Sequence, residues 1–89
     1  MSTAEGQNRW RQKNKLVKRQ LNVMARTFVH DTLERVAAEN ALRGKAEAVT
    51  YAAFIVMALE QHATLNPEAR RLLDIYREAY HRDRDIYAP

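Results

Sequence analysis

The basic side chains of this chain gather near its N-terminal end. Residues 1–30 carry seven basic groups and a single acid, Glu5, whereas residues 31–89 carry eight basic and ten acidic groups. The net charge of +4 therefore understates a one-sided positive field. Such a field attracts a polyanion, with nucleic acid the first expectation and an anionic membrane the second. A solvated tail that only aids solubility is the alternative, and the charge pattern favours nucleic acid over it.

Residues that could carry catalysis are sparse. The chain has no cysteine, and His30, His62 and His81 lie far apart without the spacing of metal ligands. No glycine-rich phosphate loop is present. His30 and Asp31 are adjacent, but neighbours on a helix point about 100° apart and do not face each other. We therefore expect a protein that is not an enzyme and that uses no metal and no cofactor.

One segment, Lys18–Arg26, alternates in the way that predicts a short strand with one apolar face. One face holds Leu21, Val23 and Ala25, and the other holds Gln20, Asn22 and Met24. A single strand cannot satisfy its own backbone hydrogen bonds, and the chain offers no second strand. The simplest partner is the same strand from a second copy, paired antiparallel across a twofold axis.

Two helices are expected to follow this strand. The first has Thr27 as its expected N-cap and is expected to end at Ala41–Gly44, with Gly44 supplying the turn. The second runs from about Lys45 to His62, and Ala48–Leu59 within it is apolar on all sides. A helix of that kind is normally buried, and one small domain cannot bury it alone. We therefore expect a second subunit to cover part of it.

A third helix is predicted to begin at Asn66-Pro67-Glu68, which supplies a cap, a proline in the first turn and an acid beside it. It continues as an apolar stripe that includes Leu72, Leu73, Tyr76 and Tyr80. The fold class expected from these elements is mostly α, with one short N-terminal strand.

Length and hydropathy set the remaining bounds. A chain of 89 residues makes one small domain, which without disulfides or a metal is expected to be stabilised by oligomerisation. The longest apolar run, Ala52–Leu59, is far shorter than the roughly 20 residues that a membrane span needs. The N-terminus is polar, without the apolar segment of a secretory signal. We expect a cytoplasmic protein that does not associate with membranes.

The order strand, helix, turn, helix resembles the ribbon-helix-helix (MetJ/Arc-type) family of DNA-binding proteins. The matching stretches are Gln20–Arg26 for the ribbon, Arg35–Asn40 for the end of the first helix, and Gly44–Val49 for the turn and second helix start. They keep register without a gap over Gln20–Leu59. The resemblance implies an intertwined homodimer with a DNA-binding domain at 18–63. The polar composition predicts a flexible basic arm at 1–17, and the additional C-terminal helix at 64–89 lies beyond the family pattern.

The resemblance also implies a site. The ribbon of this family enters the major groove, so the outward residues Gln20, Asn22 and Met24 would contact bases. Glutamine and asparagine amides each offer a donor and an acceptor, which suits adenine N6 and N7. Met24 departs from the basic residue that is common at the third position. Ordinary solvent-facing polarity is the alternative for Gln20 and Asn22.

Phosphate contacts would come from the start of the second helix and from basic side chains near the N-terminus. The residues concerned are Arg9, Arg11, Lys13, Lys15, Lys18, Arg43, Gly44, Lys45 and Ala46. The subunits would share an apolar core. Its expected members are Leu21, Val23, Leu33, Val36, Val49, Ala52, Ala53, Val56 and Leu59.

The function expected from these features is sequence-specific binding of double-stranded DNA by a homodimer, as in a transcriptional repressor. Plasmid partition, relaxosome accessory and antitoxin proteins of the same fold are alternatives. The third helix could support the dimer, join dimers on tandem sites, or bind a protein partner. A different class, a helical interaction module with a solubilising basic tail, applies if Lys18–Arg26 forms no strand. Single-stranded RNA binding is weaker, because only Trp10 offers an obvious stacking surface.

Overall fold

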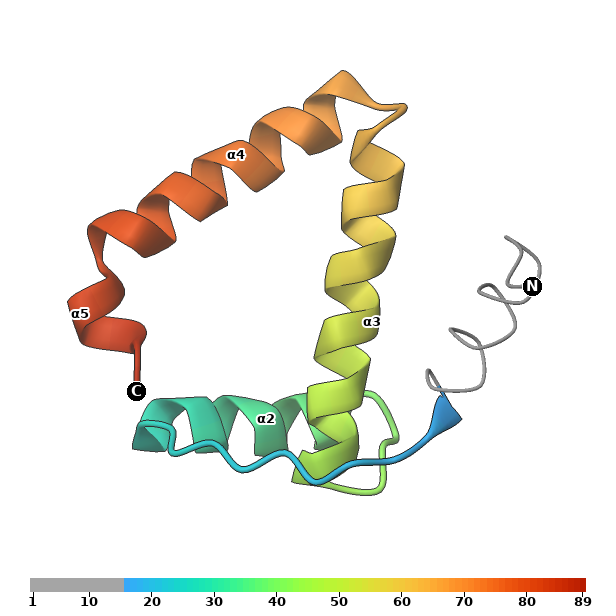
Figure 1. Cartoon of the computed structure of the whole chain (residues 1–89), viewed down its shortest axis with the longest axis vertical. Helices are drawn as coiled ribbons and strands as arrows, with labels where there is room; N and C mark the ends of the chain where they lie inside the picture. Colours follow the sequence, from blue (N-terminus) through green and yellow to red (C-terminus); the bar gives the residue numbers. More distant parts are fainter. Residues whose placement is uncertain (1–15) are drawn as a thin grey trace, which may run out of the picture.

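The described part of the chain is mostly helical, as the sequence predicts. The computed structural model describes residues 16–89, and the helices in this range are α2 (Thr27–Glu39), α3 (Lys45–Ala63), α4 (Pro67–Arg82) and α5 (Arg84–Tyr87). Helices α2, α3 and α4 form three sides of a triangle, and α5 turns back toward the start of α2 (Figure 1). Packing between the long helices is sequential, α2 on α3 and α3 on α4.

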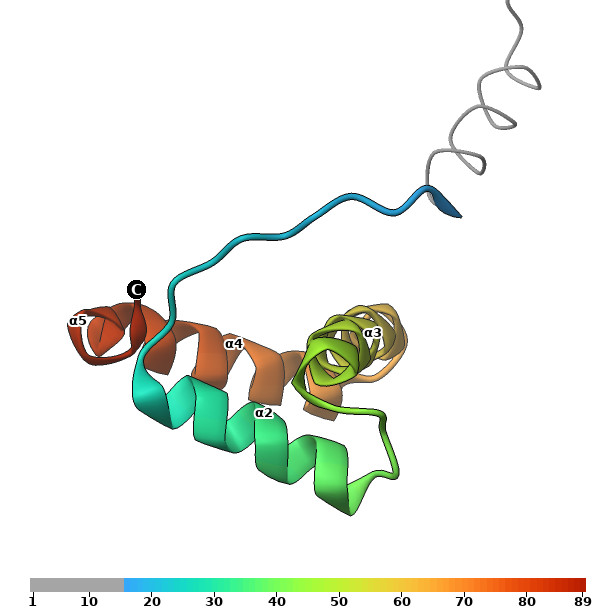
Figure 2. The same cartoon turned by 90° about the horizontal axis from the view of Figure 1, so that it is seen from below.

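Residues 18–26 contain neither helix nor turn. The segment runs from the start of α2 toward α3 on one side of the helix pair (Figures 1 and 2). No strand is formed within residues 16–89. Because a strand is defined by its pairing and a single copy supplies no partner, the expected ribbon stays a prediction. The expected domain boundaries after residues 17 and 63 also stay predictions. Most of the basic arm lies outside the described residues.

Helix α2 starts without the cap expected from the sequence. Arg26, with φ −66° and ψ 156°, occupies the N-cap position, and no side chain caps the helix. Thr27 is instead the first helical residue. A threonine one position inside the helix cannot accept from the free N–H groups in the geometry of an N-cap, which requires an extended backbone at that residue.

The end of α2 also differs from the expectation. The left-handed residue is Ala41, with φ 56°, and not Gly44. The amide of Leu42 donates to the carbonyl of Ala37 at 2.9 Å, which closes a Schellman turn around Ala41. Gly44 lies three residues later as the N-cap of α3. The sequence pattern misplaced the turn because glycine is the usual residue at the left-handed position, and here an alanine occupies it.

This turn gives a prediction for stability. An L-residue in the left-handed region costs about 1–2 kcal/mol, a cost that glycine avoids. We expect Ala41→Gly to raise the free energy of unfolding by about 1 kcal/mol, which raises Tm by about 4–8 °C for a domain of this size. Ala38→Gly, in the last turn of α2, is the control and should destabilise by about 0.5–1 kcal/mol. Equal losses in both variants, measured by thermal unfolding, would contradict the strain at Ala41.

Asparagine side chains form hydrogen bonds at two corners of the triangle. Asn40 donates through Nδ2 to the carbonyl of Val36 at 2.9 Å and accepts from the Tyr51 hydroxyl at 3.1 Å, which links the end of α2 to α3. At the other corner, Asn66 Oδ1 accepts from the amide of Ala69 at 3.0 Å, and Pro67 follows it in the first turn of α4. The predicted cap of the third helix is therefore confirmed.

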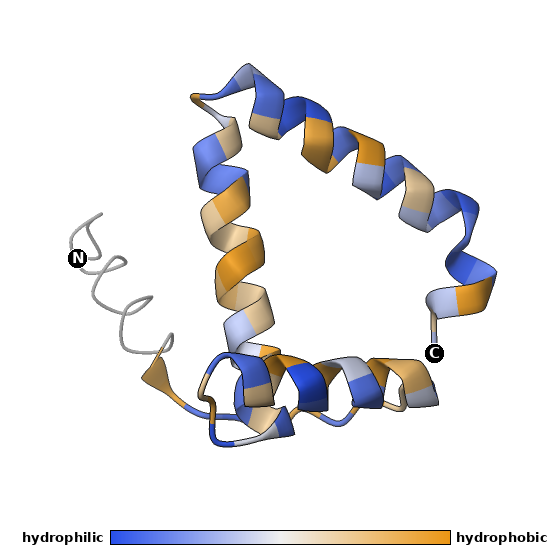
Figure 3. Ribbon diagram, turned by 180° about the vertical axis from the view of Figure 1, so that it is seen from behind, coloured by the Kyte–Doolittle hydropathy of each residue, from blue (hydrophilic) through white to orange (hydrophobic). Residues whose placement is uncertain are grey.

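The interior of the single chain is very small. The buried apolar residues are alanines, Ala37, Ala48 and Ala63, and no large side chain is fully buried among residues 16–89. Helix α3 is apolar along much of its length (Figure 3). Its large apolar side chains are instead exposed, including Phe54, Val56 and Met57. None of the residues expected in a dimer core is buried in one copy. Since α3 is apolar on all sides, two flanking helices leave much of it uncovered.

None of the helices within residues 16–89 combines the length and the apolar character required to cross a lipid bilayer.

Candidate nucleic-acid interface

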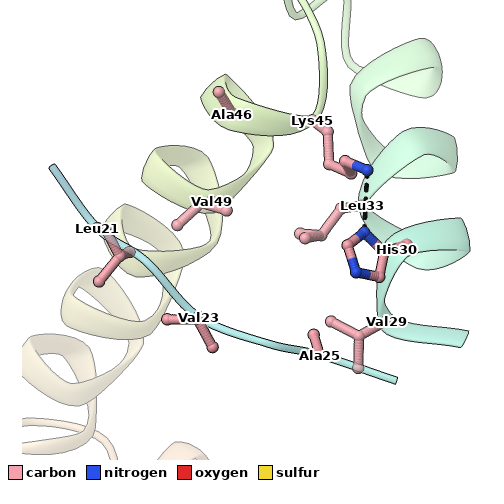
Figure 4. Close-up of a pocket in the computed structure, with 9 residues that line it drawn as sticks. All are labelled: Leu21, Val23, Ala25, Val29, His30, Leu33, Lys45, Ala46 and Val49. Carbon is pink, nitrogen blue, oxygen red and sulfur yellow. Dashed lines mark hydrogen bonds between the residues drawn. The ribbon is translucent and has the colours of Figure 1, made fainter. Parts of the chain in front are cut away.

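The apolar side of residues 18–26 faces the helix pair α2 and α3. Leu21, Val23 and Ala25 line a hollow of about 360 Å³ that this segment shares with the two helices (Figure 4). The helices contribute Val29, His30, Leu33, Lys45, Ala46 and Val49. Alternate residues of the segment thus share one direction, as the alternation in the sequence predicts.

The intervening residues Gln20, Asn22 and Met24 do not line this hollow, and all are exposed. Exposure alone does not separate the two sides, because Leu21 and Val23 are still 70% and 61% exposed. Direction separates them, since only the apolar residues line the hollow between the segment and the helices. The amides of Gln20 and Asn22 are therefore accessible to a ligand in this structure.

Five of the residues predicted to contact phosphate lie together at the start of α3. Lys18, Arg43, Gly44, Lys45 and Ala46 all line one hollow of about 620 Å³, together with Glu47 and Thr50. Lys18 reaches it from the extended segment and the others from the turn and first turn of α3. The remaining predicted phosphate contacts, Arg9, Arg11, Lys13 and Lys15, lie outside the described residues.

The N-terminus of α3 adds backbone donors to this hollow. Its N-cap, Gly44, has no side chain to cap the helix, and the amide of Ala48 is the first to bond within the helix, to Gly44 at 3.0 Å. The N–H groups of the three preceding residues therefore carry the partial positive charge of the helix start. Such a helix start, flanked by cations, suits a phosphate.

Glu47 is a feature of this hollow that the sequence analysis missed. Its Oε1 accepts from the backbone N–H of Arg43 at 2.7 Å, so the carboxylate lies at the helix start and offsets part of the positive charge. The signal was present, because an acid three residues after an N-cap commonly bonds back to the preceding backbone. Thr50, which lines the same hollow, carried no such signal.

The ammonium group of Lys45 points to α2. Its Nζ lies 2.9 Å from His30 Nδ1 (Figure 4). The same Nζ lies 3.9 Å from Glu34 Oε1. Lys45 therefore lines both hollows, but its charge is engaged by α2. Neither Lys18 nor Arg43 forms an ion pair with another residue in the range 16–89. These two are the cations available to a ligand at the start of α3. His30 is half-buried and bonded to Lys45.

Comparison of the chain with family models, curated proteins and solved structures found no match. The resemblance to ribbon-helix-helix proteins therefore depends on the residues of Gln20–Leu59 alone. Within residues 16–89, no group of three or more His, Cys, Asp or Glu side chains is placed to hold a metal ion.

Proposed function

We propose that this chain forms a homodimer of the ribbon-helix-helix class that binds double-stranded DNA and reads bases with a β-ribbon. The observation that carries the proposal is the convergence of Lys18, Arg43 and the uncapped start of α3 in one hollow. The exposed residues Gln20, Asn22 and Met24 follow directly along the chain from Lys18. Basic groups for phosphate next to the exposed side-chain amides of Gln20 and Asn22 are what a groove-binding protein requires.

The extended segment supports the proposed ribbon. Its apolar residues face the helices. The backbone of residues 18–26 belongs to no helix or turn. A second copy would supply an antiparallel strand and satisfy those backbone groups. A two-stranded ribbon fits the major groove of B-DNA, where each base pair presents a distinct pattern of donors and acceptors.

The exposed apolar surface of α3 supports the second copy. A soluble protein rarely leaves so many large apolar side chains uncovered unless a partner covers them. Val49, Val56 and Leu59, which are members of the expected dimer core, are exposed in the single chain. An intertwined dimer would bury them against the same helix of the other subunit, which supplies the apolar core that one copy lacks.

The role that this binding best fits is that of a transcriptional repressor in the cytoplasm. Partition, relaxosome and antitoxin proteins of the same fold would use the same DNA contacts. Assembly of dimers on tandem sites, or capture of a protein by the C-terminal helices, would add to this role without changing the interface. The competing class, a helical interaction module, predicts no ordered pairing of Lys18–Arg26 in solution.

The test is duplex binding by a Lys18→Gln/Arg43→Gln variant across a salt series. We expect it to weaken binding of specific and random duplexes alike, because phosphate contacts carry no sequence information. With both residues present in each subunit, the slope of log K against log salt should become shallower by about 2–4.

The matched control is Arg77→Gln/Arg82→Gln, which removes the same charge from exposed positions on α4. This control should change the slope by less than about 1, because its charges lie away from the proposed interface. If both variants weaken binding equally, net charge alone governs the interaction and the assigned phosphate site is wrong.

A further inference from the structure

The C-terminal end of the chain returns to the junction between the extended segment and α2. Arg26, the last residue before α2, donates through Nε to the carbonyl of Ala88 at 2.8 Å and through Nη2 to the carbonyl of Asp85 at 3.2 Å. Figures 1 and 2 show α5 and the C-terminal end beside the start of α2. The Arg26 guanidinium group thus bonds to two carbonyl groups that lie 59 and 62 positions further along the sequence.

Aromatic rings make a second contact at the same junction. The ring of Phe28, in the first turn of α2, meets Tyr87 edge to face with centroids 5.5 Å apart. Tyr87 in turn stacks on Tyr80 of α4 at 6.5 Å. Tyr87 therefore connects the start of α2 to α4 through side chains, and α2 and α5 have no backbone packing of their own.

This junction adjoins the proposed base-reading residues. Met24, Ala25 and Arg26 line a small hollow of about 230 Å³ together with Pro89. The C-terminal residues thus contact the end of the segment that presents Asn22 and Met24. Apart from this contact, the segment is attached through apolar side chains that remain largely exposed.

We propose that residues 84–89 form a brace that fixes the direction in which the extended segment leaves α2, with Arg26 and Tyr87 as positioning residues. The proposal depends on the proposed function, because what the brace positions is the base-reading face. A segment held in place before binding loses less conformational entropy when it meets DNA. The resulting gain in binding free energy is largest for contacts that need a fixed geometry. Base contacts need that geometry more than phosphate contacts do.

Tyr87→Ala tests the brace without changing the charge of the protein. Its control is Tyr87→Phe, which keeps the ring that contacts Phe28 and Tyr80. Without DNA, we expect amide hydrogen exchange at Val29 and His30, whose N–H groups donate to the carbonyl of Arg26, to become about tenfold faster in Tyr87→Ala and to stay unchanged in Tyr87→Phe. Circular dichroism should show the same helix content in both, since Tyr87 lies in a four-residue helix.

Duplex binding then tests the positioning role. We expect the ratio of specific to random affinity to fall about tenfold in Tyr87→Ala, with random-duplex affinity and its salt slope unchanged. Arg26→Lys, which keeps the charge but cannot donate two fixed bonds, should lower the ratio in the same direction.

The outcomes separate the two proposals. Unchanged exchange in Tyr87→Ala overturns the brace itself. Faster exchange with full discrimination overturns its positioning role and leaves the proposed function intact. Failure of the wild type to bind any duplex overturns the proposed function whatever the exchange shows. Loss of protection together with loss of discrimination, both retained in Tyr87→Phe, supports the brace.

Discussion

Replacing Gln20 and Asn22 together by alanine is expected to remove most of the discrimination between a specific and a random duplex. Both side chains are exposed on the side of the segment that faces away from α2 and α3. An amide that donates to and accepts from one adenine contributes about 1–3 kcal/mol of discrimination. Losing both, in each of two subunits, should lower the specific affinity by more than about a hundredfold.

Random-duplex affinity and its salt dependence should change little in this variant, because alanine removes no charge. Competition binding between a selected duplex and a random one at several salt concentrations measures both quantities. Gln61→Ala, at an exposed position on α3, is the control for the loss of an amide and should leave discrimination intact. Discrimination that survives the loss of Gln20 and Asn22 would remove these residues from the site.

Val56→Asp is expected to prevent dimer formation. Val56 is 52% exposed in the single chain, where an aspartate would be well solvated and cost little. In the proposed dimer the same position is buried, and an unpaired buried charge costs more than about 3 kcal/mol in addition to the lost apolar contact. Since each dimer contains the change twice, the dimer dissociation constant should rise on the order of 10⁴-fold.

Val17→Asp is the matched control, because Val17 is 57% exposed and lies outside the expected dimer core. Sedimentation equilibrium over a concentration series, with thermal unfolding at the same concentrations, distinguishes the two variants. We expect the control to remain dimeric, with a Tm that rises with protein concentration as in the wild type. If Val56→Asp and Val17→Asp behave alike, α3 is not buried between subunits.

The helices could be predicted from local sequence signals, and their ends only in part. The Asn66-Pro67 start of α4 was predicted correctly because cap and proline act within a few residues of the chain. The Schellman turn was misplaced because Ala41, and not Gly44, takes the left-handed conformation. The residue type of Ala41 does not indicate this conformation, because glycine is the residue that usually adopts it.

The membership of the candidate site stays a prediction, and the geometry of its residues followed only in part from the sequence. Lys18 and Arg43 were each predicted from their charge and from the family resemblance, and the structure brings them to one hollow. The engagement of Lys45 by His30 and Glu34 was not predicted, because it joins side chains on two different helices. Charge patterns along a chain give the sign of a surface but not the partner of each group.

By itself, the sequence determined the helical class, the one-sided distribution of charge and the alternation of Leu21, Val23 and Ala25, since these follow from residue type and from periods of two or 3.6 residues. Only the tertiary structure decided that Lys18 lies at the start of α3, that Lys45 turns to α2, and that Arg26 bonds to the carbonyl of Ala88. The physical reason is that such contacts depend on the directions in which whole helices leave their turns. A small change at Ala41 or Asn66 would move every residue beyond it.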